Sequence, residues 1–224
     1  MNAPATSLMP IFAAPFGVVP ITAAAELNPD LAVLFAARAM THYREPAAPP
    51  DPLCFRSRED LLEWPEPAVS QLGRAIMAGV SEVVIAANQY SAAERETLGV
   101  QARVRFVIVR PDGHLSGATA PMASWCAVYC VAAPAPTPAR MDSAVLRLYA
   151  VRHPSMFLDA SNYRMRIPFS ADHHVWRPVP GQMAVFPASI PHEVALNRTH
   201  VDLILVIARL RFADQGVAGA VPPW

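Results

Sequence analysis

The hydrophobic pattern divides the chain into a helical first part and a strand-rich second part. Between residues 66 and 87, apolar residues recur every three or four positions, which predicts an amphipathic helix. An earlier helix is predicted to begin at Asn28, a good capping residue, with Pro29 in the first turn. Ser91 and Glu94 form the pattern of a capping box, which predicts a short third helix.

From residue 101 the pattern changes to a period of two, as expected of strands with one buried face. A further strand, interrupted by prolines, is predicted within 8–21. No helical pattern separates the later strands, so the sequence indicates an antiparallel sandwich or jelly roll. The predicted strands cover 103–109, 125–131, 145–151, 163–169, 183–186 and 201–210.

We predict that the chain forms a single domain, 1–224, because neither an internal repeat nor a flexible linker divides it. Its parts would be an N-terminal strand with helices (1–100), a β core (101–212) and a tail (213–224). The helices are expected to pack on one face of the sheet. A content of 53% hydrophobic residues is enough to bury a sizeable core.

Composition excludes several classes of partner. The formal net charge is zero, and no basic stripe stands out, so we expect no nucleic acid partner. No apolar run approaches about 18 residues, so we expect no membrane span. The first residues lack a basic leader, which favours the cytoplasm. The odd number of cysteines argues against a disulfide scaffold, and Cys54, Cys126 and Cys130 follow no metal-binding spacing.

The strongest motif lies at 177–194 and reads R-P-V-P-G-Q-M-A-V-F-P-A-S-I-P-H-E-V. Pro180 and Gly181 fit the centre of a type II turn, because proline sets the first φ and glycine supplies the positive second one. A short strand follows, and then a single histidine, His192. This pattern resembles the strand that carries the distal histidine in iron(II)/2-oxoglutarate oxygenases.

The resemblance extends over about 8–210 and implies a mainly β fold. That fold is a double-stranded β-helix, of the jelly-roll or cupin-like type, with N-terminal helices packed on the sheet. The family's dioxygenases bind iron(II) through two histidines and one carboxylate, and they use 2-oxoglutarate as co-substrate. The resemblance makes His192 the distal metal ligand and places it at a strand end, facing the interior near 118–120.

The other two metal ligands of the family are missing from their expected positions. The family's proximal motif is a histidine, one residue, and then an aspartate or a second histidine. Counted back from the strand at 126–131, these ligand positions fall on Ala118 and Ala120. Alanine cannot bind iron. The resemblance therefore points to a degenerate member of the family.

The family's arginine for the far carboxylate of 2-oxoglutarate follows the distal histidine by about eight to ten residues, where it forms a bidentate pair. Here those positions hold His200 and Asp202. Asp202 would repel a dicarboxylate. Arg198, displaced from the expected place, and His200 are the candidate cofactor-binding residues that remain.

An atypical metal site is a further candidate. Asp112 and His114 are two positions apart, so both could point to one face of an extended segment and join His192. Asp-Gly at this place is also ordinary turn chemistry. Of His173 and His174, at most one can face the interior beside His192, and the favoured interpretation is that both are surface or interface residues.

Three functions follow as hypotheses. The first is a non-catalytic protein, a pseudoenzyme without cofactor, that binds a small molecule, a peptide or a protein in a pocket beside His192. That pocket would be lost if Met122 or Trp125 filled it. The alternative is an active non-heme iron oxygenase, a hydroxylase of a small molecule or peptide, that uses Fe(II) and 2-oxoglutarate at an atypical site around His192. The third is a structural subunit that pairs with a catalytically complete relative. A mean hydropathy of +0.25 suits such a homo- or hetero-oligomer.

Overall fold

The structure, a computed structural model, describes residues 13–136, 138–150, 165 and 173–214. In this part of the chain the helices are α1 (Ala24–Arg38), α2 (Pro67–Ala87) and α3 (Ala92–Thr97). The strands are β1 (Gly17–Pro20), β2 (Cys54–Arg56), β3 (Leu98–Val109), β4 (Leu115–Ala118), β5 (Trp125–Ala132), β6 (Leu146–Tyr149), β7 (His173–Trp176), β8 (Gln182–Pro187), β9 (His192–Val194) and β10 (Leu203–Asp214).

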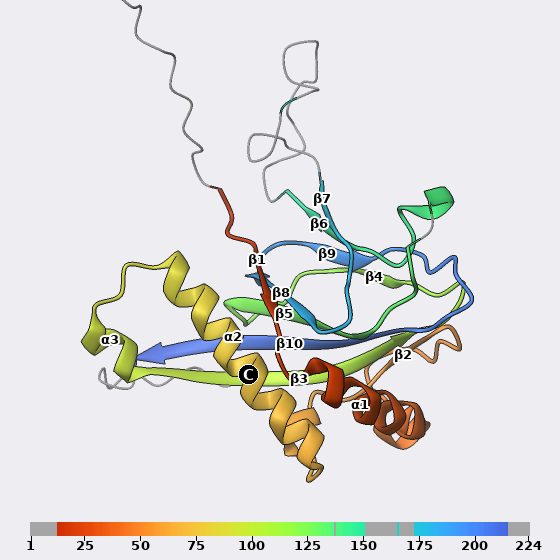
Figure 1. Cartoon of the computed structure of the whole chain (residues 1–224), viewed down its shortest axis with the longest axis horizontal. Helices are drawn as coiled ribbons and strands as arrows, with labels where there is room; N and C mark the ends of the chain where they lie inside the picture. Colours follow the sequence, from red (N-terminus) through yellow and green to blue (C-terminus); the bar gives the residue numbers. More distant parts are fainter. Residues whose placement is uncertain (1–12, 137, 151–164, 166–172, 215–224) are drawn as a thin grey trace, which may run out of the picture.

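The strands form two antiparallel sheets. The larger sheet has the order β1-β8-β5-β10-β3-β2, and the smaller has the order β4-β9-β6-β7. From β3 to β10 the chain passes back and forth between the two sheets, which is the interleaved path of a double-stranded β-helix. The predicted fold class is therefore confirmed. Figure 1 shows the smaller sheet above the larger one, with α1 below and α2 crossing the larger sheet diagonally.

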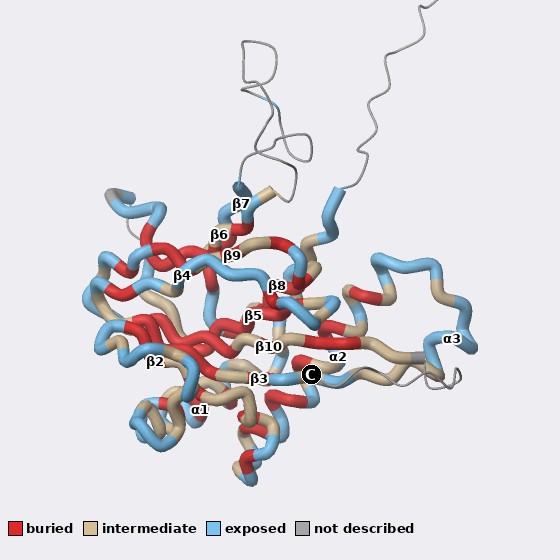
Figure 2. Tube along the Cα trace, turned by 180° about the vertical axis from the view of Figure 1, so that it is seen from behind, coloured by how far each residue is buried: buried red, intermediate tan, exposed pale blue. Residues whose placement is uncertain are grey.

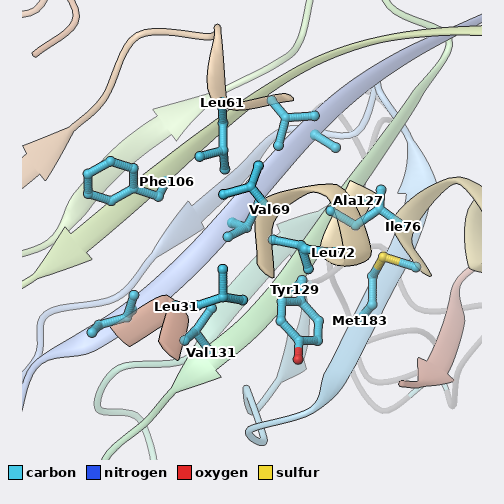
Figure 3. Close-up of a cluster of buried hydrophobic side chains, with 14 of the residues drawn as sticks. Leu31, Leu61, Val69, Leu72, Ile76, Phe106, Ala127, Tyr129, Val131 and Met183 are labelled. Atoms are coloured by element: carbon cyan, nitrogen blue, oxygen red, sulfur yellow. The ribbon is translucent and has the colours of Figure 1, made fainter. Parts of the chain in front are cut away.

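Two clusters of buried side chains hold these layers together. One lies between the helices and the larger sheet, where Leu72 and Ile76 of α2 meet Tyr129 and Met183 (Figure 3). The other lies between the two sheets and includes Phe186. Buried residues accordingly follow the strands and the inner faces of the helices (Figure 2). The expectation that the helices pack on one face of the sheet is confirmed.

Helix α2 begins and ends where the hydrophobic period predicted. By length and composition alone this helix could cross a membrane, which corrects the expectation that no segment is long and apolar enough. Seven of its residues, among them Val69, Leu72, Ile76 and Val80, are nevertheless buried against the rest of the protein. Burial of one face is what a core helix shows.

Helix α1 begins at Ala24, which is earlier than predicted. Asn28 is not its cap but lies inside it, where its side-chain oxygen accepts a hydrogen bond from the Tyr129 hydroxyl at 2.5 Å. Pro29 also lies inside the helix. The contact with Tyr129 joins segments 101 residues apart, and no local capping rule can anticipate it. The capping box at Ser91 is confirmed.

The turn before β8 has the predicted geometry. Gly181 has a φ of +87°, and the backbone N–H of Gln182 donates to the carbonyl of Val179 at 2.9 Å. Both features are those of a type II turn with glycine at its third position.

The predicted strands are found with shifted ends, except 163–169, of which the structure describes only Met165. Strand β3 starts at Leu98 because β10 pairs with it along its whole length, from Leu203 opposite Val109 to Asp214 opposite Leu98. The segment 8–21 contributes only β1 within its described part. Four strands were not predicted, and each has three or four residues: β2, β4, β7 and β9.

Candidate functional site

His192 is the first residue of β9 and faces the space between the two sheets. It pairs with Ala118 of β4 on one side and with Leu148 of β6 on the other. Only 8% of its surface is exposed. The prediction that His192 lies at a strand end, inside the β-helix and beside Ala118, is therefore confirmed.

Three contacts fix the imidazole of His192. Its Nδ1 lies 3.0 Å from the carbonyl oxygen of Ile190. A carbonyl only accepts hydrogen bonds, so Nδ1 carries the proton and donates. The lone pair of Nε2 then faces the Sγ atom of Cys126, 4.0 Å away. The ring of Phe186 packs edge-on, with centroids 5.0 Å apart.

The histidine and the cysteine form a neutral pair. Burial lowers the pKa of His192, and the hydrogen bond to Ile190 opposes this only partly. Burial raises the pKa of the Cys126 thiol to about 12, although Arg209 and Arg105 act in the opposite direction. At neutral pH the thiol therefore keeps its proton and the imidazole is uncharged. A reactive thiolate does not form under these conditions.

We expect the free energy of unfolding to fall as the pH decreases below about 6.5. The pKa of His192 is lower in the folded protein than in the unfolded chain, so the unfolded chain takes up the proton first. The stability that the neutral ring contributes is thus present above pH 6.5 and lost below it, by at most about 1.4 kcal/mol per pH unit. Urea unfolding from pH 8 to 5 measures this.

The matched variants are His192→Gln, which removes the buried titrating group, and His200→Gln, which removes an exposed one. We expect the first to flatten the dependence on pH and the second to leave it as in the wild type. An equal dependence in both variants would show that His192 is not the group responsible.

The residues around His192 do not fit a centre with two histidines and one carboxylate. Ala118 stands directly opposite His192, and Ala120 follows it as a buried residue. Within the described ranges, no group of three or more His, Cys, Asp or Glu side chains could hold a metal ion. The donors found at this place are one imidazole and one protonated thiol, whereas iron(II) requires several ligands in a fixed geometry.

Asp112 and His114 lie at the other end of β4. At one end of β4, Ala118 pairs with His192, and at the other end Leu115 pairs with Val194. Asp112 and His114 precede Leu115, so they lie at the end of β4 that is remote from His192. The backbone N–H of Asp112 donates to the carbonyl of Asn197 at 2.7 Å. Asp112 has a φ of +61°. The structure does not bring this pair to His192, and the Asp-Gly sequence serves the turn.

A close backbone contact explains the glycine of that turn. A Cβ atom at Gly113 would lie 2.2 Å from the carbonyl oxygen of Leu53. No side chain can be accommodated at such a distance, so glycine is required here by the packing of the turn.

Arg198 and His200 lie in the turn between β9 and β10, and both are exposed. The backbone of Arg198 is tied down, because its N–H donates to Ser143 Oγ at 2.8 Å and its carbonyl accepts from Arg140 at 3.0 Å. Asn197, the preceding residue, bonds to Gly113. The two candidates therefore lie near the Asp112 turn and not at the rim beside His192.

The two adjacent histidines of β7 lie on opposite faces of the smaller sheet, as expected for neighbouring residues of a strand. His174 pairs with Leu148, which also pairs with His192, so His174 and His192 lie in one row across the smaller sheet. The His174 ring packs against Phe16, with centroids 4.9 Å apart. His173 lies opposite Tyr149 on the other face. Both histidines are exposed.

Neither Met122 nor Trp125 fills the space beside His192. Met122 is 60% exposed, and Trp125 packs against the cluster on the helix side of the larger sheet. The side chains in contact with the imidazole are instead Cys126 and Phe186. A pocket of about 720 Å³ lies elsewhere, between the start of α1 and the turn before β8.

Cys126 was not recognised from the sequence as part of this site. The sequence does indicate which face of the sheet Cys126 occupies, because neighbouring residues of β5 face opposite sides and Cys126 therefore lies on the face opposite to that of Ala127. What the sequence lacks is the contact between the two sheets, which joins residues 66 positions apart.

No protein-family model matches the sequence. No curated protein matches it either. Solved structures do match in fold. A prolyl-4-hydroxylase from Pseudomonas putida is 15% identical, with a TM-score of 0.56, over 88% of this chain and 91% of that one. AviO1 from Streptomyces viridochromogenes is 13% identical, with a TM-score of 0.57, over 93% of both chains.

A third similar structure is an oxidoreductase of the 2OG-Fe(II) oxygenase family from Burkholderia pseudomallei. It is 13% identical, with a TM-score of 0.53, over 89% of this chain and 87% of that one. Identities this low show the fold alone. The chain thus has the double-stranded β-helix fold of 2-oxoglutarate/iron(II) oxygenases, as the sequence motif indicated.

Proposed function

We propose that this chain, which has the fold of 2-oxoglutarate/iron(II) oxygenases, is a non-catalytic protein that binds a small molecule, a peptide or a partner protein. One observation carries the proposal. The Nε2 atom of His192, the nitrogen left available to bind a metal, faces the thiol of Cys126 at 4.0 Å. On the neighbouring strand, alanine stands where a second ligand would be needed.

The chemistry of these groups argues against iron. A cysteine binds a metal as its thiolate, and burial raises the pKa of Cys126 to about 12, so loss of this proton is costly. The edge of Phe186 further restricts the space in front of the imidazole. A single histidine cannot hold iron(II) against water, because affinity comes from several ligands together.

Within this proposal the protein works in the cytoplasm and without a cofactor, alone or in a homo- or hetero-oligomer. An apolar surface supports a protein partner. Val175 and Tyr149 are 43% and 37% exposed, and they belong to β7 and β6 at one edge of the smaller sheet. Exposed edge strands readily pair with other chains.

Turnover of 2-oxoglutarate tests the proposal. Purified protein with iron(II), ascorbate and oxygen is expected to release no succinate above the level of the His192→Ala variant. Succinate production that His192→Ala abolishes would instead establish an active oxygenase. Loss of that activity in Asp112→Asn or His114→Ala would identify the atypical metal site.

A further inference from the structure

The pocket of about 720 Å³ lies on the helix side of the larger sheet, remote from His192. Its walls come from the end of β1, the first turns of α1, the end of β5 and the turn before β8. Strand β1 leads directly into the start of α1 (Figure 1). The pocket borders Val131, whereas His192 contacts Cys126 at the other end of β5. These two residues of β5 are about 17 Å apart, at about 3.3 Å per residue.

Two motifs of the sequence meet at this pocket, although neither takes part in the site at His192. Asn28 lines it from α1, and Pro180 and Gly181 line it from the turn. The backbone N–H of Ile21 donates to the carbonyl of Gly181 at 2.8 Å. A Cβ atom at Gly181 would lie 2.7 Å from the Cβ of Ala24, so the turn is in close contact with α1. The walls are therefore fixed to one another before any ligand enters.

A buried tyrosine orients the amide of Asn28. Burial raises the pKa of Tyr129 to about 12, so its hydroxyl keeps the proton and donates it to Asn28 Oδ1 at 2.5 Å. The Nδ2 group of Asn28 then has two hydrogens to donate, and no group within the described ranges accepts them. Asparagine is also a poor helix former, because its side chain competes for backbone hydrogen bonds. Asn28 thus presents an oriented, unused donor to the pocket.

The other polar groups of the pocket are uncharged. Gln182 and Thr22 line it, and neither side chain forms a hydrogen bond within the described part of the chain. The remaining described residues of the lining are alanine, proline, glycine, valine and isoleucine. A charged ligand would lose water here without gaining an ion pair, which is costly. The lining therefore selects an uncharged molecule that has a polar and an apolar part.

We propose that this pocket binds a small uncharged organic molecule, whose carbonyl group accepts a hydrogen bond from Asn28 and whose apolar rings pack on the alanine and proline walls. The inference rests on the proposed binding function and names its site and ligand class. The volume is within the range of small-molecule sites, which are mostly apolar with a few placed polar groups. Neither His192 nor iron takes part.

The competing role of Asn28 is to join α1 to β5 through its bond with Tyr129. Asn28→Asp separates the two roles. A carboxylate oxygen still accepts from the Tyr129 hydroxyl, but the Nδ2 donor is lost and a charge enters the pocket. If Asn28 had only the structural role, this variant would bind ligands as the wild type does.

Nuclear magnetic resonance of the full ¹⁵N-labelled chain tests the site, with EDTA present to remove metal ions. The probes are the cyclic dipeptide cyclo(Leu-Pro) and coumarin, both uncharged ring compounds with carbonyl groups. We expect at least one to bind with a dissociation constant below about 1 mM. Binding should shift the side-chain amide signal of Asn28, which is identified by its absence in Asn28→Asp. The linear dipeptide Leu-Pro, which has two charged ends, should not bind.

We expect Asn28→Asp and Ala25→Phe, which fills the pocket, to weaken binding at least about tenfold, or about 1.4 kcal/mol. The controls should bind as the wild type does. Gln71→Glu adds the same charge at an exposed site on α2, and Val33→Phe adds bulk on α1 at a residue that is 73% exposed and does not line the pocket.

The absence of a saturable shift with both probes would overturn the inference. Equal affinity in Asn28→Asp and Gln71→Glu would also overturn it, as would equally tight binding of the linear dipeptide. Because EDTA is present, these outcomes are independent of succinate production. A failure here rejects this pocket, whereas succinate production that depends on His192 rejects the non-catalytic function.

Discussion

Replacing Phe106 by alanine is expected to lower the free energy of unfolding by about 4 kcal/mol. Phe106 is fully buried on β3. Its ring stacks on Phe35 of α1, with centroids 4.4 Å apart, and on Phe55 of β2 at 5.3 Å. Trp64 packs edge-on at 5.9 Å. The substitution would leave a cavity at the junction of a helix and two strands.

Urea unfolding measures this loss, and Phe212→Ala is the matched control. Phe212 is only partly buried and lies on the neighbouring strand β10. We expect a clearly smaller loss there. Phe106→Leu, which keeps most of the volume, should remain folded if the alanine variant does not. Equal losses for Phe106→Ala and Phe212→Ala would contradict the packing described for this cluster.

The second large effect is a gain of metal binding. The double substitution Ala118→His with Ala120→Asp is expected to raise the affinity for cobalt(II), a spectroscopic substitute for iron(II), at least about a hundredfold, or about 2.7 kcal/mol. Ala118 pairs with His192, so the new imidazole would lie beside the existing one. Two histidines and a carboxylate are the ligand set of a non-heme iron site.

The matched control is Gly117→His with Thr119→Asp, one position away in each case. Neighbouring residues of a strand face opposite sides, and a Cβ atom at Gly117 would contact Glu193 and not the imidazole. Adding Cys126→Ala to both double variants removes the thiol in front of Nε2. Equal cobalt(II) affinity in the two resulting triple variants would contradict the position of Ala118 beside His192.

Sequence patterns were sufficient where the fold depends on local period and turn chemistry. Helix α2 and strand β8 have enough alternating or periodic positions to define their ends, and the Pro-Gly turn fixed the frame that leads to His192. Strands of three or four residues, such as β4 and β9, contain too few positions for a period to be recognised. These two strands carry Ala118 and His192 of the site.

The remaining features depend on contacts between distant segments. The start of α1 was placed too late because Asn28 bonds to Tyr129 instead of capping the helix. Spacing alone made Asp112 and His114 look like a ligand pair, whereas the register of β4 with β9 places them away from His192.

The most direct test of the account is the amount of iron(II) that the purified wild-type protein binds under anaerobic conditions, with and without 2-oxoglutarate. A neutral His192 that faces a protonated thiol predicts no saturable binding in either case. One equivalent of iron(II), retained on gel filtration and lost in His192→Ala, would contradict the account and would establish a metal site at His192.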